Sequence, residues 1–155
     1  MKTTYSLAEA RRKIERYCTY QERCHIEVEK KLLEMGMIPL VREELISALI
    51  EANYLNESRF AQSFARGKFR IKKWGKVRIQ RELKARKITD YNIKLGLKEI
   101  SESDYNTTFW ALFEKKKAAL SSFSLPVQKK KLFDYLAYRG WETEKIFEAI
   151  ELLKK

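Results

Sequence analysis

The sequence predicts an all-α fold in which three tandem three-helix repeats form an elongated, curved array. Five Gly and two Pro among 155 residues leave few residues for the tight turns of a β-sheet protein. Leu, Ala, Glu, Lys and Arg, which favour helices, are abundant. A leucine-centred pattern also recurs, with Leu32, Leu83 and Leu136 lying 51 and 53 residues apart. Recurrence at this interval is typical of a helical repeat array.

Each copy of the pattern marks the end of a helix. A second apolar residue precedes the leucine by four positions, so the two side chains share one helix face. Four residues after the leucine comes Gly36 or Gly140, the usual left-handed residue that ends a helix. Lys87 takes this place in the second copy, so we expect a less favourable helix end there. The apolar residues that flank the three leucines are Val28 and Met37, Ile79 and Ile88, and Leu132 and Trp141.

The helix starts carry signals of their own. The stretch Ser6–Glu9 has the spacing of a capping box, and Thr89 is a suitable N-cap. Pro39 and Pro126 suit first-turn positions, whereas the Cys24 thiol is a poor cap, so the second helix should start weakly. The predicted helices are 7–19, 24–36 and 39–53 in the first repeat (1–55), 57–73, 76–87 and 90–100 in the second (56–101), and 104–121, 126–139 and 143–153 in the third (102–155).

Length and composition limit the class of protein. A chain of this length buries enough surface to fold without a disulfide or a structural metal. No window approaches the ~18 apolar residues of a membrane span, and the N-terminal residues contain no apolar signal region. We therefore expect a cytoplasmic protein in which Cys18 and Cys24 are free thiols.

Positive charge is concentrated in the middle third of the chain. The formal net charge is +12, and residues 54–101 hold fourteen basic and four acidic residues. Residues 1–53 are neutral overall, and residues 102–155 carry ten basic and eight acidic residues. A surface that serves only solubility mixes both signs along its length. The concentration therefore indicates a polyanionic partner, and nucleic acid more than a membrane surface.

The middle repeat resembles the signature of the RecX family. It contains Glu57-Ser58-Arg59-Phe60-Ala61, followed by Phe64, Arg66, Gly75, Ile79, Glu82 and Leu83. The flanks agree, since Asn53-Tyr54-Leu55 is similar to the family's Gly-Tyr-Leu and Leu32–Met37 to its Leu-x-x-x-Gly-Phe. The resemblance covers nearly the whole chain and is strongest at 53–88. The family has Ser where this chain has Cys24, and Gly where it has Lys87.

The resemblance implies a regulatory role. RecX proteins bind the RecA–DNA filament, limit its growth, and thereby inhibit strand exchange and coprotease activity in DNA repair and the SOS response. They have no cofactor and no enzymatic activity. On this basis we expect RecA as the partner, weak and non-specific contact with single- or double-stranded DNA, no membrane contact and a monomeric chain.

The basic run 66–87 is the candidate binding surface. It alternates cations with apolar residues, which places the apolar side chains on the core and the cations outward. The expected contacts to the filament or to DNA are Arg66, Lys68, Arg70, Lys72, Lys73, Lys76, Arg78, Arg81 and Lys84. The signature residues with an expected structural role are Arg59, Phe60, Phe64, Ile79, Glu82 and Leu83. Among these we expect Glu82 to pair with Arg59 or Arg66 on a neighbouring helix.

Other interpretations of the same residues remain. On the simplest interpretation, the basic run is a helix face that contacts only solvent. If it binds a partner, the acidic groups of RecA suit it as well as the phosphates of DNA do. The repeats also suit a helix-turn-helix-like DNA-binding protein that acts without RecA, although base readout favours Arg, Asn or Gln over Lys. A nuclease would need clustered acids, and the middle third has four scattered ones. His25 and Cys18 alone are too few ligands for zinc.

Overall fold

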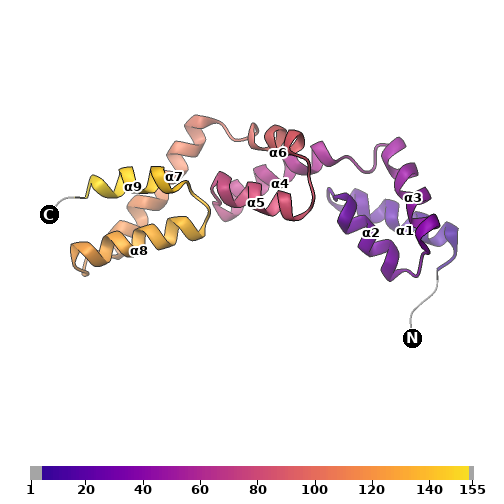
Figure 1. The fold of residues 1–155 in the computed structure, drawn as a ribbon, viewed down its shortest axis with the longest axis horizontal. Helices are drawn as coiled ribbons and strands as arrows, with labels where there is room; N and C mark the ends of the chain where they lie inside the picture. Colours follow the sequence, from indigo (N-terminus) through magenta and orange to yellow (C-terminus); the bar gives the residue numbers. More distant parts are fainter. Residues whose placement is uncertain (1–4, 154–155) are drawn as a thin grey trace.

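The computed structural model describes residues 5–153, and over that range it contains nine α-helices and no strand. The helices are grouped in threes along one long axis, so the molecule is elongated (Figure 1). The all-α repeat array is thus confirmed. Residues 1–4 and 154–155 lie outside the described residues. The predicted first repeat and the N-terminal segment expected to lack a signal both begin in 1–4. The predicted third repeat ends in 154–155.

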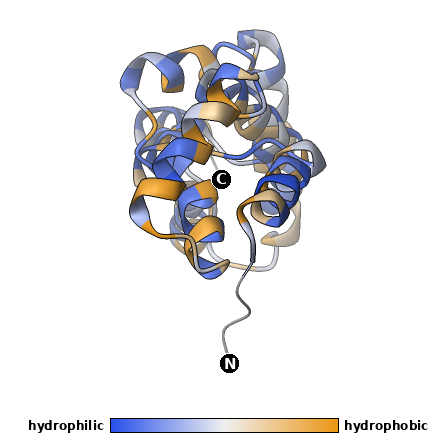
Figure 2. Cartoon of the chain, turned by 90° about the vertical axis from the view of Figure 1, so that its right-hand side faces the viewer, coloured by the Kyte–Doolittle hydropathy of each residue, from blue (hydrophilic) through white to orange (hydrophobic). Residues whose placement is uncertain are grey.

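The first repeat comprises α1 (Leu7–Tyr20), α2 (His25–Glu34) and α3 (Pro39–Glu51). The predicted capping box starts α1: the Glu9 N–H donates to the Ser6 hydroxyl and the Ser6 N–H donates to the Glu9 carboxylate, both at 3.2 Å. The end view in Figure 2 shows both apolar and polar segments on the helices, as expected of helices that bury one side. The buried sides of the three helices form a core of their own, which includes Ile14, Val28, Leu32, Leu45 and Leu49.

The second repeat comprises α4 (Glu57–Lys72), α5 (Lys76–Ala85) and α6 (Asp90–Leu97). Thr89 caps α6 as predicted, because its side chain accepts a hydrogen bond from the Asn92 N–H at 3.3 Å. The turn after α5 contains a residue in a left-handed conformation, Lys87, at φ 58°. Its equivalents Gly36 and Gly140 adopt φ values of 80° and 90°. Lys87 therefore takes on the strained conformation that glycine accommodates freely.

The third repeat comprises α7 (Glu102–Ala119), α8 (Leu125–Tyr138) and α9 (Thr143–Glu151). Its buried residues form one continuous core with those of the second repeat. Leu32, Leu83 and Leu136 each have no exposed surface, which confirms that they occupy equivalent core positions. The second and third repeats therefore pack as one unit, and the first repeat has a separate core.

The junction between the first and second repeats is mainly polar. At the start of α2, the Cys24 N–H donates to Glu27 at 3.0 Å and the His25 N–H donates to Glu57 of α4 at 3.1 Å. These carboxylates supply the capping that the Cys24 thiol was expected to lack. The Cys24 side chain is itself fully buried in the core of the second repeat. One apolar side chain and several carboxylate contacts thus join the first repeat to the rest.

Candidate functional site

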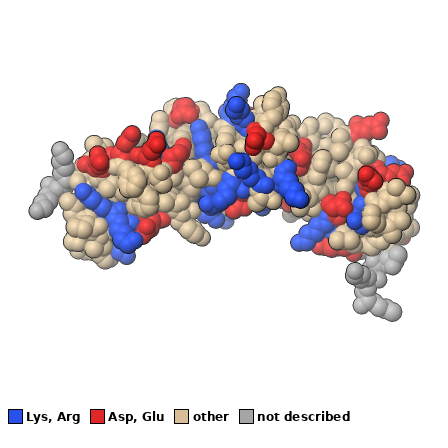
Figure 3. Space-filling model, in the orientation of Figure 1, with Lys and Arg blue, Asp and Glu red and all other residues tan. Residues whose placement is uncertain are grey.

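The basic strip consists of the nine cations predicted to bind a partner, and the structure places them on α4, on Lys73 directly after it, and on α5. Figure 3 shows Lys and Arg side chains gathered over this middle part of the molecule. Two thirds of the strip is exposed. The exposed members are Arg66, Arg70, Lys72, Lys73, Arg81 and Lys84.

Lys76 and Arg78 do not face outward, which contradicts the sequence expectation. The Lys76 ammonium lies 3.0 Å from Glu102 and 4.5 Å from the Tyr105 ring centroid. The Arg78 guanidinium lies between the rings of Trp74 and Tyr138, at 4.2 and 5.0 Å from their centroids. Both side chains are half-buried because the start of α5 packs against the third repeat. Their charges therefore contribute to the junction between repeats.

Two further members of the strip also have partners within the chain. Lys68 is half-buried, with its ammonium 5.1 Å from the Trp74 ring centroid, and Arg66 forms an ion pair with Glu99. The rest of the strip has no carboxylate within 4.0 Å among the described residues. We call these five residues the free cations: Arg70, Lys72, Lys73, Arg81 and Lys84.

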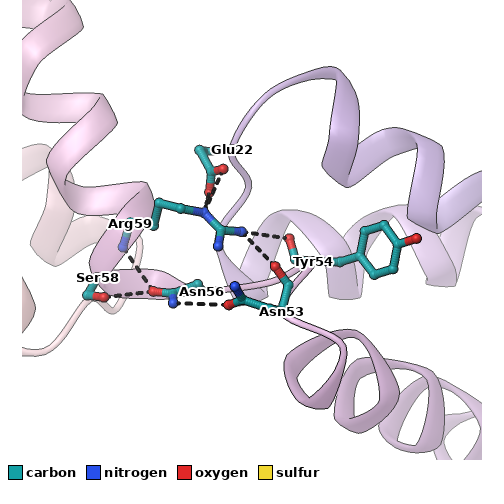
Figure 4. Close-up of polar contacts among 6 residues, drawn as sticks. All are labelled: Glu22, Asn53, Tyr54, Asn56, Ser58 and Arg59. Carbon is teal, nitrogen blue, oxygen red and sulfur yellow. Dashed lines mark hydrogen bonds and ion pairs between the residues drawn. The ribbon is translucent and has the colours of Figure 1, made fainter.

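The signature arginine joins the first repeat to the second. The Arg59 guanidinium lies 2.8 Å from the Glu22 carboxylate and donates to the Asn53 carbonyl at 2.9 Å (Figure 4). At the start of α4, the Asn56 side chain accepts a hydrogen bond from the Arg59 N–H at 3.0 Å and one from the Ser58 hydroxyl at 2.7 Å. Arg59 is thus fixed at both its backbone and its side chain, as a structural role requires.

The predicted partner of Glu82 was wrong. Glu82 lies 3.2 Å from Arg86, the residue that follows α5, while Arg59 pairs with Glu22 in the loop after α1 and Arg66 pairs with Glu99 in the turn after α6. The choice between these pairings depends on how α5 is rotated against α4, which spacing along the chain does not specify. Of the remaining signature residues, Phe60, Ile79 and Leu83 are buried and Phe64 is half-buried.

Backbone hydrogen bonds lock the second repeat to the third. The Gly75 N–H donates to the Arg139 carbonyl at 2.9 Å, and the Val77 N–H donates to the Gly140 carbonyl at 3.0 Å. Between them, the Lys76 N–H donates to the Tyr105 hydroxyl at 2.8 Å. These amides are the free donors of a helix start, and here the third repeat satisfies them.

Tyr105 continues this chain of hydrogen bonds into the third repeat. Its hydroxyl donates to the Glu142 carboxylate. Burial, and then the hydrogen bond to Glu142, raise the pKa of Tyr105 well above its ordinary value. The tyrosine therefore stays protonated, and keeps donating to Glu142, at neutral and moderately alkaline pH.

The described residues offer little for metal or membrane chemistry. No group of three or more His, Cys, Asp or Glu side chains comes together among them, and none of their helices is long and apolar enough to cross a bilayer. Cys18 and Cys24 are buried free thiols. Burial raises the pKa of each thiol to about 11, so both are weak nucleophiles near neutral pH.

The sequence interpretation missed two cations of the third repeat. Lys115 of α7 and Arg139 at the end of α8 line a groove together with Lys72 and Lys73. The available signal was the pair of lysine runs at 115–117 and 129–131. Averaging charge over residues 102–155 hid these runs, because acidic residues of the same repeat cancel them. Figure 3 shows the separation, with red over α9 and blue over α8.

The fold and the surface together define a class of protein: an all-α array of three-helix repeats with a basic middle repeat. Family models match two stretches of the chain, "RecX, second three-helix domain" at residues 56–97 and "RecX, third three-helix domain" at residues 104–150. The two stretches together span more than half of the chain. The chain belongs to the RecX family.

Known proteins agree with this assignment. The chain is 28% identical over 138 residues to "Regulatory protein RecX" of Bacillus cereus (strain AH820), covering 89% of this chain and 51% of that protein. The protein of the same name from Bacillus cytotoxicus is 28% identical over 139 residues, covering 90% and 52%. The chain therefore spans about half the length of the curated relatives it matches.

Solved structures share the fold. The crystal structure of RecX from Lactobacillus salivarius superposes with a TM-score of 0.80 at 22% identity, covering 95% of this chain and 97% of that one. A second crystal structure of a regulatory protein RecX gives a TM-score of 0.78 at 19% identity, covering 94% and 73%.

Proposed function

We propose that this chain binds the RecA–DNA nucleoprotein filament as a monomer and inhibits RecA's recombinase and coprotease activities, modulating DNA repair and the SOS response. Membership of a family of regulatory proteins supports a regulatory role. The filament is a long polyanion, and an elongated array with its cations at the centre is complementary to it (Figures 1 and 3).

The observation that carries the proposal is the set of free cations on α4 and α5. Like charges that lie close together on helices without acidic partners destabilise the free protein. Neutralising them against phosphates or carboxylates of a partner removes that repulsion and releases counterions. The free cations thus favour a bound state over the isolated chain, and they explain why binding should weaken as salt is raised.

A helix-turn-helix-like protein that reads bases without RecA is less compatible with this geometry. Such a protein inserts the N-terminal residues of one helix into the major groove. The first amides of α5 are bonded to Arg139, Gly140 and Tyr105 of the third repeat. The first residue of α6 is Asp90, an exposed acid that phosphates repel. The geometry fits better with exposed helix faces that contact the phosphate backbone of the DNA.

The direct experiment is a titration of the chain into RecA-coated single-stranded DNA while ATP hydrolysis is followed. We expect substoichiometric chain to lower the rate of hydrolysis, and strand exchange measured in parallel to fall with it. Raising the salt concentration should shift the inhibition curve steeply to higher protein. Unchanged hydrolysis and strand exchange at a stoichiometric amount of folded chain would contradict the proposal.

A further inference from the structure

The junction between the second and third repeats holds an open groove of about 560 Å³. The end of α4 forms one wall, and α7 and α8 form the other. Four cations line it and no carboxylate does. The polar side chains of the lining that bear on a ligand are Lys72, Lys73, Thr107, Thr108, Lys115 and Arg139.

No acidic group of residues 5–153 neutralises the positive charge of the groove. Lys72, Lys73 and Lys115 are exposed, and among the described residues none has a carboxylate within 4.0 Å. Arg139 donates to the carbonyl of Lys72 at 2.8 Å, and its guanidinium lies 4.8 Å from the Tyr135 ring centroid. These contacts orient the guanidinium and leave its charge unpaired.

The two walls of the groove are held in place before any ligand arrives. The Trp141 indole N–H donates to the Lys73 carbonyl at 3.2 Å, and the Gly75 N–H donates to the Arg139 carbonyl at 2.9 Å. Both bonds cross from one repeat to the other, and the two repeats share one apolar core. The two walls therefore cannot separate easily, and ordering the groove costs little free energy when a ligand binds.

From this geometry we propose that the groove binds the phosphodiester backbone of a nucleic acid, so that the third repeat contacts DNA together with the second. This rests on the proposed function, because it assigns the DNA of the filament to a particular site. Lys, Arg and Thr side chains are common donors to phosphate oxygens. A protein surface mixes charges of both signs. Four cations without a carboxylate are complementary to a nucleic-acid strand, in which every phosphodiester group is negative.

The test measures binding of a fluorescent oligothymidylate to the 155-residue chain without RecA, by anisotropy. The groove variant is Lys72→Gln with Lys115→Gln, one change on each wall. If each lysine contacts one phosphate, affinity should fall roughly 20-fold at 0.1 M salt, and the slope of log K against log salt should decrease by about 1.4. The control variant, Lys94→Gln with Lys98→Gln, loses the same charge from exposed sites on and beside α6 and should change affinity by less than about threefold.

The other outcomes distinguish a failure of the groove assignment from a failure of the proposed function. An equal loss in both variants would mean that net charge alone governs binding. Displacement of the oligonucleotide by inorganic phosphate at matched ionic strength would mean a site for single anions. If the groove variant binds DNA like the parent but no longer inhibits RecA, the groove takes an acidic protein surface. If the parent binds DNA through the groove but leaves RecA unaffected, the proposed function fails and the groove assignment stands.

Discussion

Replacing Gly75 by alanine should weaken the packing of the second repeat against the third. A Cβ atom at this position would lie 2.4 Å from the carbonyl oxygen of Gly140 and 2.6 Å from the Cα atom of Trp141. Carbon atoms in contact normally lie about 3.5–4.0 Å apart, so the two loops must move by roughly 1 Å. The backbone at Gly75 has φ −78°, which any residue adopts, and the clash is therefore the whole of the effect.

The expected loss of stability combines the cost of overpacking with the cost of the hydrogen bonds that the movement breaks. Overpacking of this kind costs about 1–3 kcal/mol. The Gly75–Arg139 and Val77–Gly140 backbone hydrogen bonds cross the same contact, and losing them adds roughly 1 kcal/mol each. We expect the free energy of unfolding to fall by about 3–5 kcal/mol, which for a domain of this size lowers Tm by roughly 6–20 °C.

Urea unfolding followed by circular dichroism measures this change, and Gly67→Ala is the matched control. Gly67 lies inside α4, and an added Cβ atom there meets nothing within 4 Å. Because alanine favours the helix, Gly67→Ala should raise stability by about 0.5–1 kcal/mol. If Gly75→Ala is as stable as the parent, the close backbone approach between the repeats is not what holds them together.

Three more predictions concern Lys87, two glutamates and the two cysteines. Lys87→Gly should raise the free energy of unfolding by about 0.5–1 kcal/mol because it relieves the left-handed φ of 58°; a loss of stability in urea would show no strain there. Glu22→Gln should lower stability by about 1 kcal/mol and Glu82→Gln by less, since only Glu22 links two repeats; equal melting curves would argue against the linking role. With folded-state thiol pKa values of about 11 against an ordinary 9.0, Cys18 and Cys24 keep protons that the unfolded chain has lost. Stability should therefore fall as pH rises from 9 to 11, and a thiol reagent at pH 8 should react slowly until urea is added; rapid reaction of the native chain would contradict their burial.

The fold was predictable because its determinants are local. Leu32, Leu83 and Leu136 lie in the last turns of equivalent helices, and spacing alone identified them as core positions. The expected helix starts agree with the observed ones to within two residues, because capping side chains and prolines act within one turn. The less favourable helix end at Lys87 was also predictable, since the repeated leucine pattern places a left-handed residue at this position.

The candidate site was less predictable because it depends on how helices of different repeats meet. The sequence identified the basic strip but not the burial of Lys76 and Arg78, which follows from the packing of α5 against the third repeat. Arg59 finds Glu22 thirty-seven residues away, in a turn that helix periodicity does not position. Lys115 joins the basic surface through tertiary packing and was concealed by the near-neutral charge of its own repeat.

The central claim is that free cations of α4 and α5 restrain RecA, and one comparison of variants tests it most directly. One variant replaces Arg70, Arg81 and Lys84 by Gln, and the control replaces the exposed lysines Lys30, Lys94 and Lys98 by Gln, with equal loss of charge. Both should melt like the parent. In RecA strand exchange, the first should need at least ~10-fold more protein for half inhibition, and the control less than about threefold more. Equal inhibition by both variants and the parent would contradict the claim.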